Sequence, residues 1–266
     1  MNPTARISAA FLVVLALVAL FAPWLAPHDP MAIQMGEELR PPSAEHWLGQ
    51  DLQGSDILSR MVHGSRTSLG IALAVVMLSG GLGVLLGALA GHFGGVFDQG
   101  LMRLVDVLLA FPGLLLAIAL VAVLGPAPEH VVIALVALGW VSFARLARGQ
   151  VLVVRERAYV LAARSMGQSE WRILVRHVLP NIMAPVIVQA TFGLASVVLA
   201  ESSLAFLGLG APPGSPSWGA MLSEGKRVLF DAPHVSIVPG VAILLVVLAF
   251  NLLGDHLRDR WDPKAH

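Results

Sequence analysis

Residues 145–180 read RLARGQVLVVRERAYVLAARSMGQSEWRILVRHVLP and interrupt a chain that is otherwise strongly apolar. This segment holds seven of the seventeen Lys and Arg residues, and long apolar stretches flank it on both sides. Two short helices with a joint are predicted, because Gly167 can take the positive φ that ends a helix and Ser169 is a suitable N-cap for the next one. Pro180 is expected to end or kink the second helix.

Each predicted helix has a face suited to contact. One face of the first helix carries small or apolar side chains: Tyr159, Ala162, Ala163 and Met166. Arg157 and Arg164 lie outside this face. The second has an apolar stripe at helical spacing: Trp171, Leu174, Val175 and Val178. These residues alone leave two alternatives open, a helix pair lying in the lipid headgroups and a docking element for a partner protein.

The composition indicates a protein with several membrane spans. Of the 266 residues, 56% are hydrophobic and 13% are charged, against about 45–50% and about 25% in soluble domains. The formal net charge is zero, so nothing in the total suggests nucleic acid as a partner. With no Cys, the chain has no disulfide framework, thiol nucleophile or iron–sulfur ligands of its own.

Six apolar stretches are predicted to be transmembrane helices, and the fold class predicted is an all-α membrane protein. The stretches are 7–25, 69–91, 101–124, 131–144, 182–209 and 235–253. The first is expected to be an uncleaved helix rather than a signal peptide, because APWLAPHDP offers a poor cleavage site. We therefore divide the chain into a first transmembrane helix (1–27), an extracytoplasmic loop (28–68) and a five-helix core (69–266) with the 145–180 loop between the fourth and fifth spans.

The distribution of basic residues predicts the orientation. With the 145–180 loop and the tail 255–266 inside, twelve of the seventeen Lys and Arg residues are cytoplasmic and five are outside. Both termini are then cytoplasmic. A multi-pass arrangement of this kind also makes the lipid bilayer an obligatory partner.

Particular residues within the spans suggest packing contacts. Gly83, Gly87 and Gly91 recur every four residues, which predicts a close helix–helix contact. Arg103 is expected to pair with Asp106 at i, i+3. Glu201 is the one ionisable side chain deep in a predicted span, where it either lines the translocation pathway or is a buried hydrogen-bonded group.

Motifs for catalysis, nucleotide binding and metal binding are missing. The segment from Gly219 to Arg227 differs from a Walker A in spacing and lacks the Ser or Thr that binds Mg²⁺. The nine His are scattered without ligand spacing, so no metal site is predicted. His46 and His63, on the predicted outer side, would matter if a metal were the cargo. The chain is therefore not expected to be an enzyme.

A resemblance decides between the two alternatives for the loop. Ala162, Ala163, Gly167 and Leu179-Pro180 match in register the Glu-Ala-Ala loop of permease subunits in binding-protein-dependent ABC importers. Leu161 stands in place of the motif's Glu and His177 in place of its Ile. The segment HWLGQDLQGSDILSRMVHGSRTSL, residues 46–69, resembles a signature of the dipeptide, oligopeptide and nickel branch. The resemblance covers most of the chain from His46 onward, is to the C type of dipeptide permease, and implies the inner membrane of a bacterium or archaeon.

This resemblance implies a function and a set of partners. It implies a permease subunit for short peptides that works with a second related permease subunit, two cytoplasmic ATPase subunits that bind ATP and Mg²⁺, and an extracytoplasmic binding protein. The residues that it assigns to ATPase coupling are Tyr159, Ala162, Ala163, Arg164, Met166, Gly167, Leu179 and Pro180. A nickel permease is the alternative within the branch. A self-contained secondary transporter is the alternative outside it, disfavoured because no internal repeat is visible.

Overall fold

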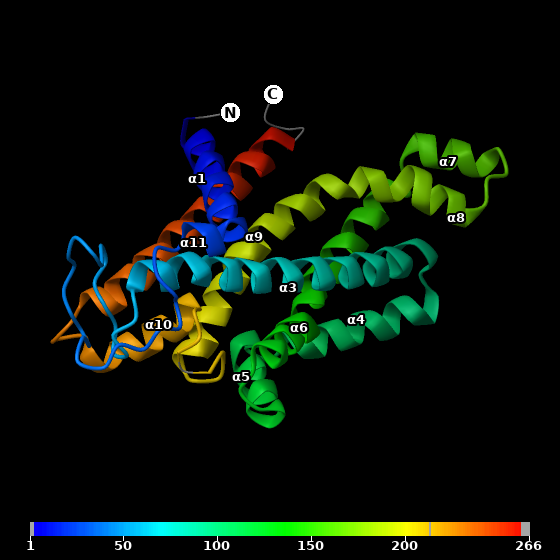
Figure 1. Ribbon diagram of the computed structural model, residues 1–266. Coiled ribbons are helices and arrows are strands. Elements are labelled where there is room, and N and C mark those ends of the chain that lie inside the picture. Colours follow the sequence, from blue (N-terminus) through cyan, green and yellow to red (C-terminus); the bar gives the residue numbers. More distant parts are fainter. Residues whose placement is uncertain (1–2, 213, 262–266) are drawn as a thin grey trace.

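The computed structural model describes residues 3–212 and 214–261, and every regular element in this part of the chain is helical. Figure 1 shows the helices arranged lengthwise around the long α3. The elements are α1 Pro3–Leu20, α2 Ala22–Leu25, α3 Ile57–Phe93, α4 Gly95–Leu109, α5 Gly113–Leu124, α6 Pro128–Val154, α7 Ala158–Ser165, α8 Glu170–Ile173, the π-helical segment η1 Leu174–Val178, α9 Leu179–Phe206, α10 Trp218–Gly225, the 3₁₀ turn η2 Lys226–Val228 and α11 His234–Trp261.

Five helices are long and apolar enough to cross a membrane, and a sixth span results if the bent pair of α4 and α5 counts as one. The five are α1, α3, α6, the stretch from α8 through α9, and α11. The prediction of six spans is thus confirmed, but the third is not straight. α4 and α5 meet at 88°, where Pro112 lacks the amide hydrogen needed to continue a helix.

Two helices extend beyond the apolar stretches that predicted them. α3 begins at Ile57 rather than at Leu69, so the last part of the polar segment 28–68 is already helical. Asp56 is the cause, because its carboxylate accepts a hydrogen bond from the amide of Ser59 and caps the helix. α6 continues past Ala144 to Val154, so the first part of the 145–180 loop is the end of a long helix.

Glycines bring α3 and α6 into backbone contact, as predicted. A Cβ added to Gly83 would lie 2.3 Å from the carbonyl oxygen of Trp140, and one added to Gly87 would lie 2.2 Å from that of Ala144. At Gly91 the nearest atom would be the carbonyl oxygen of Arg148, at 2.9 Å. No other residue type leaves room for this approach, which makes the α3–α6 pair the central packing contact of the fold.

The expected pair of Arg103 with Asp106 is wrong. Asp106 of α4 instead binds Arg145 of α6, with 2.5 Å between a carboxylate oxygen and Nη2, and Arg103 is exposed. Arg148 of α6 binds Asp98 of α4 through two hydrogen bonds, of 2.5 and 2.8 Å. Two arginines of the basic segment therefore hold the returning helix α4 against α6.

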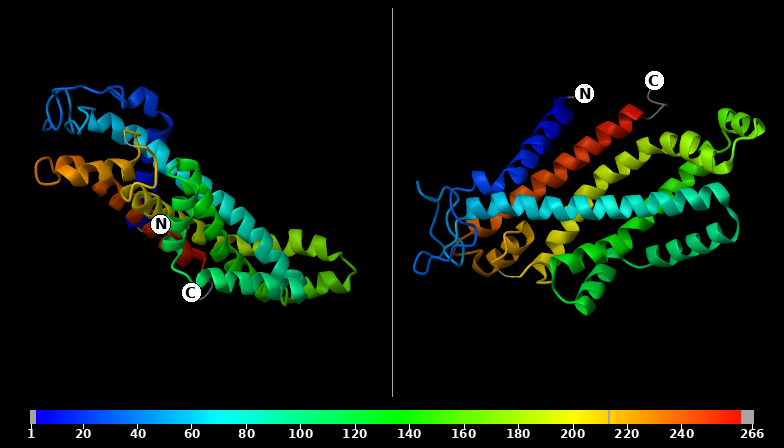
Figure 2. Two further views of the ribbon diagram at one scale, coloured as in Figure 1. Left: turned by 90° about the horizontal axis from the view of Figure 1, so that it is seen from below. Right: turned by 45° about the vertical axis from the view of Figure 1, so that its right-hand side comes forward.

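The two ends of the bundle differ in character. Residues 26–56 and α10 gather at one end, and the α7–α8 pair projects from the other (Figures 1 and 2). The first turn of α1 and the last turn of α11 lie near one another. Of the predicted tail 255–266, residues 262–266, including Lys264, lie outside the described residues.

Candidate functional site

Within the basic segment, α7 and α8 form a helical hairpin with a joint between them, as predicted. Its joint is at Gly167, whose φ of +78° is in the region that favours glycine. Ser169 occupies the N-cap position of α8, but its side chain makes no capping hydrogen bond. The joint is closed instead by Arg164, whose guanidinium donates two hydrogen bonds, of 2.7 and 3.0 Å, to the carboxylate of Glu170.

The second helix of this α7–α8 hairpin does not stop at Pro180. α8 passes through the π-helical segment η1 directly into α9, and Pro180 lies in the first turn of α9. One continuous helical path therefore joins the hairpin to the span that carries Glu201. π-helical turns often mark functional positions in helices.

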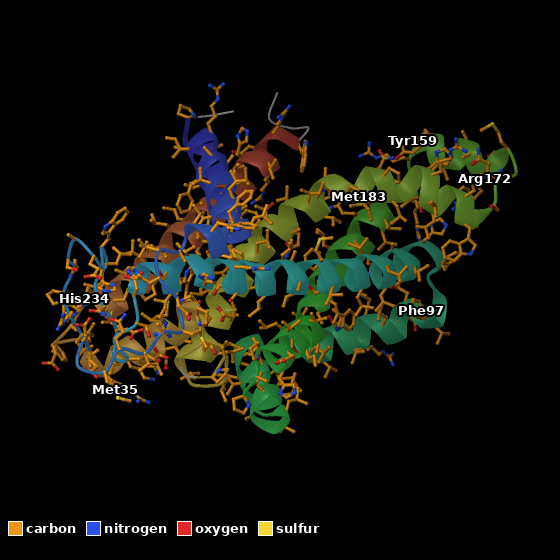
Figure 3. The ribbon with its side chains drawn as sticks, in the orientation of Figure 1. Met35, Phe97, Tyr159, Arg172, Met183 and His234 are labelled. Carbon is orange, nitrogen blue, oxygen red and sulfur yellow. The ribbon has the colours of Figure 1, made fainter. Side chains whose placement is uncertain are left out.

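The eight residues predicted to couple to an ATPase do not share one surface. Met166 is 73% exposed and Tyr159 is 45% exposed, and Figure 3 shows Tyr159 with Arg172 at this projecting end. Ala162, Arg164, Gly167 and Pro180 are also exposed. Ala163, by contrast, is only 2% exposed, and Leu179 is half-buried. Ala162 thus faces the outside of the hairpin, and Ala163 faces the spans.

The inner face of the hairpin packs on the spans. Ala163 and Val160 of α7, with Ile173 of α8, belong to one apolar core with Ala147 and Val151 of α6. Ala88 of α3 and Ile182 of α9 complete the same core. Displacement of the hairpin would therefore press directly on α3, α6 and α9.

Polar contacts strengthen this attachment. Arg155 donates a hydrogen bond of 2.9 Å to the carbonyl oxygen of Gly91, near the C-terminal end of α3. Glu170 of α8 has a carboxylate oxygen 2.9 Å from Nε2 of His92. Within residues 3–212 and 214–261, the exposed Arg157, Arg172 and Arg176 make no ion pair.

A cavity of about 810 Å³ opens beside the hairpin, and the sequence reasoning missed it. It lies between α6, the start of α7, α9 and the end of α11, and both Arg157 and Arg258 line it together with Tyr159 and Trp261. The end of α11 thus lies beside the start of the basic hairpin. In the sequence, the only indication that α7 and the end of α11 lie close together is that both segments are rich in basic residues.

Glu201 is buried at the junction of α9, α3 and α10. It is 2% exposed, and its Oε2 is 3.5 Å from Oγ of Ser68 and 3.4 Å from Oγ of Ser202. A Cβ added to Gly219 of α10 would lie 2.7 Å from the Cα of Ser202, so α10 presses closely on this region. Glu201 does not line the cavity beside the hairpin. These contacts describe a hydrogen-bonded buried group.

The signature segment at the outer end is held by a second buried network. Arg60 of α3 is 1% exposed and forms ion pairs with Asp51 and with Glu224 of α10, the latter at 2.9 Å. Glu224 also accepts a hydrogen bond of 2.8 Å from the amide of Gly214. Arg60 therefore joins the outer segment to the loop before α10. The ring of His63, singled out with His46, is 3.2 Å from the carbonyl oxygen of Ser59 in its own helix.

Comparisons with known proteins agree with this architecture. Residues 83–266 match the family described as binding-protein-dependent transport system inner membrane component, and residues 1–42 match the N-terminal TM domain of oligopeptide transport permease C. The chain is 44% identical over 264 residues to the probable D,D-dipeptide transport system permease protein DdpC of Escherichia coli strain K12, covering 99% of this chain and 89% of the relative. It is 45% identical to the glutathione transport system permease protein GsiD of Pectobacterium atrosepticum over 255 residues, covering 96% of this chain and 85% of the relative.

A solved structure shares the fold. The MetNI methionine ABC transporter in an inward-facing conformation contains a chain that superposes with a TM-score of 0.61 at 17% identity. The superposition covers 76% of the present chain and 96% of that chain.

Proposed function

Because the chain belongs to the family of binding-protein-dependent transport system inner membrane components, we propose that it is a transmembrane subunit of an ATP-driven ABC importer for dipeptides or other short peptides. The permease names of its relatives, one for D,D-dipeptides and one for glutathione, support a peptide cargo. Both cargos are short molecules with peptide bonds or closely related amide bonds. The chain itself supplies part of the translocation pathway and leaves ATP hydrolysis to other subunits.

The continuous path from the α7–α8 hairpin into α9 is the observation that supports coupling. The exposed side of the hairpin, formed by Tyr159, Ala162 and Met166, is the surface that would meet an ATPase subunit. Its opposite side packs on α3, α6 and α9. ATPase closure would push the hairpin, and the hairpin would move the spans because close-packed interiors transmit displacement.

The proposed assembly follows from this role. A second related permease subunit would complete the pathway, two cytoplasmic ATPase subunits would bind ATP and Mg²⁺, and a binding protein would deliver cargo from outside. The description of the family itself names dependence on a binding protein. The chain is a multi-pass protein of the inner membrane, and we place both termini and the hairpin in the cytoplasm on the distribution of basic residues.

Uptake by the reconstituted complex tests the proposal. The permease pair, ATPase subunits and binding protein would be assembled in proteoliposomes and offered a labelled dipeptide, a D,D-dipeptide, glutathione and Ni²⁺ in parallel. We expect ATP-dependent accumulation of at least one peptide and none of Ni²⁺. Uptake of Ni²⁺ alone would assign the chain to metal import, and uptake that needs no ATP would contradict the importer mechanism.

A further inference from the structure

The outer end of the molecule holds a group of side chains that the transport proposal does not use. His28 follows α2, and Glu45 and His46 lie together in the following polar segment. One possible ligand atom from each of these three residues lies within 4.8 Å of those from the other two. The imidazole rings of His28 and His46 have their centroids 4.6 Å apart and are tilted by 35° to each other.

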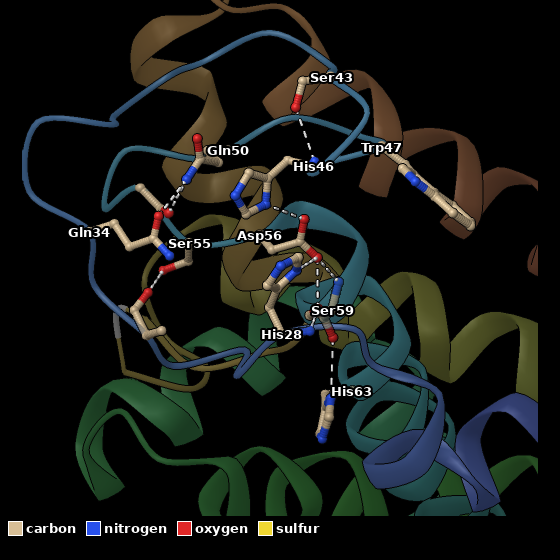
Figure 4. Close-up of polar contacts among 12 residues, drawn as sticks. His28, Gln34, Ser43, His46, Trp47, Gln50, Ser55, Asp56, Ser59 and His63 are labelled. Atoms are coloured by element: carbon tan, nitrogen blue, oxygen red, sulfur yellow. Dashed lines mark hydrogen bonds and ion pairs between the residues drawn. The ribbon is translucent and has the colours of Figure 1, made fainter.

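Asp56 lies beside both imidazoles and is within hydrogen-bond distance of that of His46 (Figure 4). Its carboxylate oxygens lie 2.9 Å from Nδ1 of His46 and 3.7 Å from Nδ1 of His28. Asp56 is itself held in place, because Oδ2 accepts hydrogen bonds of 2.7 Å from both the amide and the hydroxyl of Ser59. A carboxylate hydrogen-bonded to one ring nitrogen fixes the orientation of the ring and leaves its other nitrogen free, which is the arrangement that supports histidine ligands of metal ions, and His46 has it.

The backbone around these residues is also fixed. The amide of His28 donates a hydrogen bond of 3.0 Å to Oγ of Ser59. A tight turn fixes His46, whose amide binds Oγ of Ser43 at 3.0 Å and whose carbonyl oxygen accepts from the amides of Ser43 and Gly49. Glu45 is exposed, and the His28 side chain is 31% exposed, so solvent reaches the group.

We propose that His28, Glu45 and His46 bind a divalent transition-metal ion of the Zn²⁺ class at the outer end of the protein. Two imidazoles and a carboxylate suit Zn²⁺ or Ni²⁺ better than Mg²⁺ or Ca²⁺, which prefer oxygen ligands. Ligand atoms of a zinc ion lie about 2.0–2.2 Å from the metal, so binding draws the three side chains inward. Three protein ligands leave a position open to water.

The ion would fasten two separate parts of the chain. His28 comes directly after the first transmembrane helix and the short α2, whereas Glu45 and His46 precede α3. A metal bound by all three would hold the polar outer segment against the exit of the first span. This inference rests only on the outer end of the molecule and is independent of the proposed cargo and ATPase coupling.

Metal binding by the purified full-length chain tests the proposal. The protein would be prepared without a polyhistidine tag, stripped with a chelator and titrated with Zn²⁺, and in a parallel series with Mg²⁺. We expect one Zn²⁺ per chain, at least tenfold weaker binding in both Glu45→Gln and His28→Ala, and unchanged binding in the control His63→Ala. Asp56→Asn should weaken binding by about 10- to 100-fold, as loss of an outer carboxylate does in metal sites.

Thermal unfolding separates loss of ligands from loss of the fold. Glu45→Gln changes an exposed side chain, so the metal-free variant should unfold at the temperature of the metal-free parent. Zn²⁺ should raise the unfolding temperature of the parent and not that of this variant. An absence of Zn²⁺ binding by the parent would overturn the proposal, as would equal affinity in the parent and both ligand variants, which would mean adventitious binding elsewhere.

Discussion

Ala162 and Ala163 are neighbours with opposite environments, and this changes what a substitution at each reports. Adjacent residues on an α-helix are about 100° apart. Ala162 is exposed on the outer side of the hairpin, whereas Ala163 is buried against Val160, Ile173 and α6. Of these two residues, only Ala162 can be substituted to test contact with a partner protein without disturbing the core.

Aspartate substitutions should separate docking from folding. We expect Ala162→Asp to leave the yield of the subunit near that of the parent and to abolish ATPase co-purification and ATP-dependent uptake. Ala163→Asp buries an unpaired charge and should lower the yield itself, at a cost of about 3 kcal/mol or more. Ala44→Asp, at an exposed site of the outer segment, is the matched control and should keep its ATPase. Normal uptake by Ala162→Asp would refute the proposed docking surface.

Glu201 is predicted to act through hydrogen bonding rather than through its charge. Glu201→Gln keeps an acceptor and the shape of the side chain next to Ser68 and Ser202, so assembly and uptake should be largely retained. Glu201→Leu leaves those hydroxyls without this acceptor and should destabilise the subunit by about 1–3 kcal/mol. Thermal unfolding and uptake, measured on the same preparations, decide between the roles. A Gln variant that assembles fully and transports nothing would show that the charge itself is needed.

Two features of the α7–α8 hairpin suit the proposed coupling. Its joint has a defined geometry, and its second helix continues into a membrane span. Gly167 supplies the left-handed residue at the joint, and the Arg164–Glu170 pair closes it. The π-helical segment then leads into α9 without a break. Under the proposed coupling, movement at the tip would be carried along this helix toward Glu201.

Glycine substitutions test the joint. No atom lies within 4 Å of a Cβ added at Gly167, so Gly167→Ala is unfavourable through its φ of +78° alone, by about 1–2 kcal/mol. We expect weakened ATPase coupling and local loosening of the hairpin, seen as faster amide hydrogen exchange in residues 158–178. Gly149→Ala is the control, because Gly149 lies in α6 with equally open space and should be stabilised by about 0.5–1 kcal/mol. If both variants exchanged and coupled alike, the joint would not depend on backbone conformation.

At the scale of the whole molecule, charge and packing separate the two ends. The hairpin and the end of α11 share a cavity with two arginines, whereas the outer segment and α10 are tied by the buried ion pairs of Arg60. This separation supports an orientation with the basic end in the cytoplasm.

Thiol labelling in intact cells checks that orientation. The chain has no native Cys, so single replacements can be read without background. Ala44→Cys should react with a membrane-impermeant reagent, and Arg172→Cys should react only after the cells are opened. Both positions are exposed, so a cysteine that does not react with the reagent is not simply buried in the protein. The reverse pattern would invert the molecule in the membrane.

The sequence by itself determined the features that depend on local chemistry. Apolar length predicted the spans, glycine spacing predicted that α3 makes a close helix contact, and Gly167 predicted the joint, because each depends on neighbours in the chain or on one helix face. The Glu-Ala-Ala resemblance likewise identified the family from residues in register.

Only the tertiary structure decided how distant residues pair and which side of a short helix is covered. Asp106 pairs with Arg145 rather than Arg103, and Asp56 begins α3 well before its apolar stretch. The burial of Ala163 and the proximity of His28 to His46 also depend on segments far apart in the chain. Helical periodicity establishes that a face exists, but what covers that face is determined by the packing of the other helices.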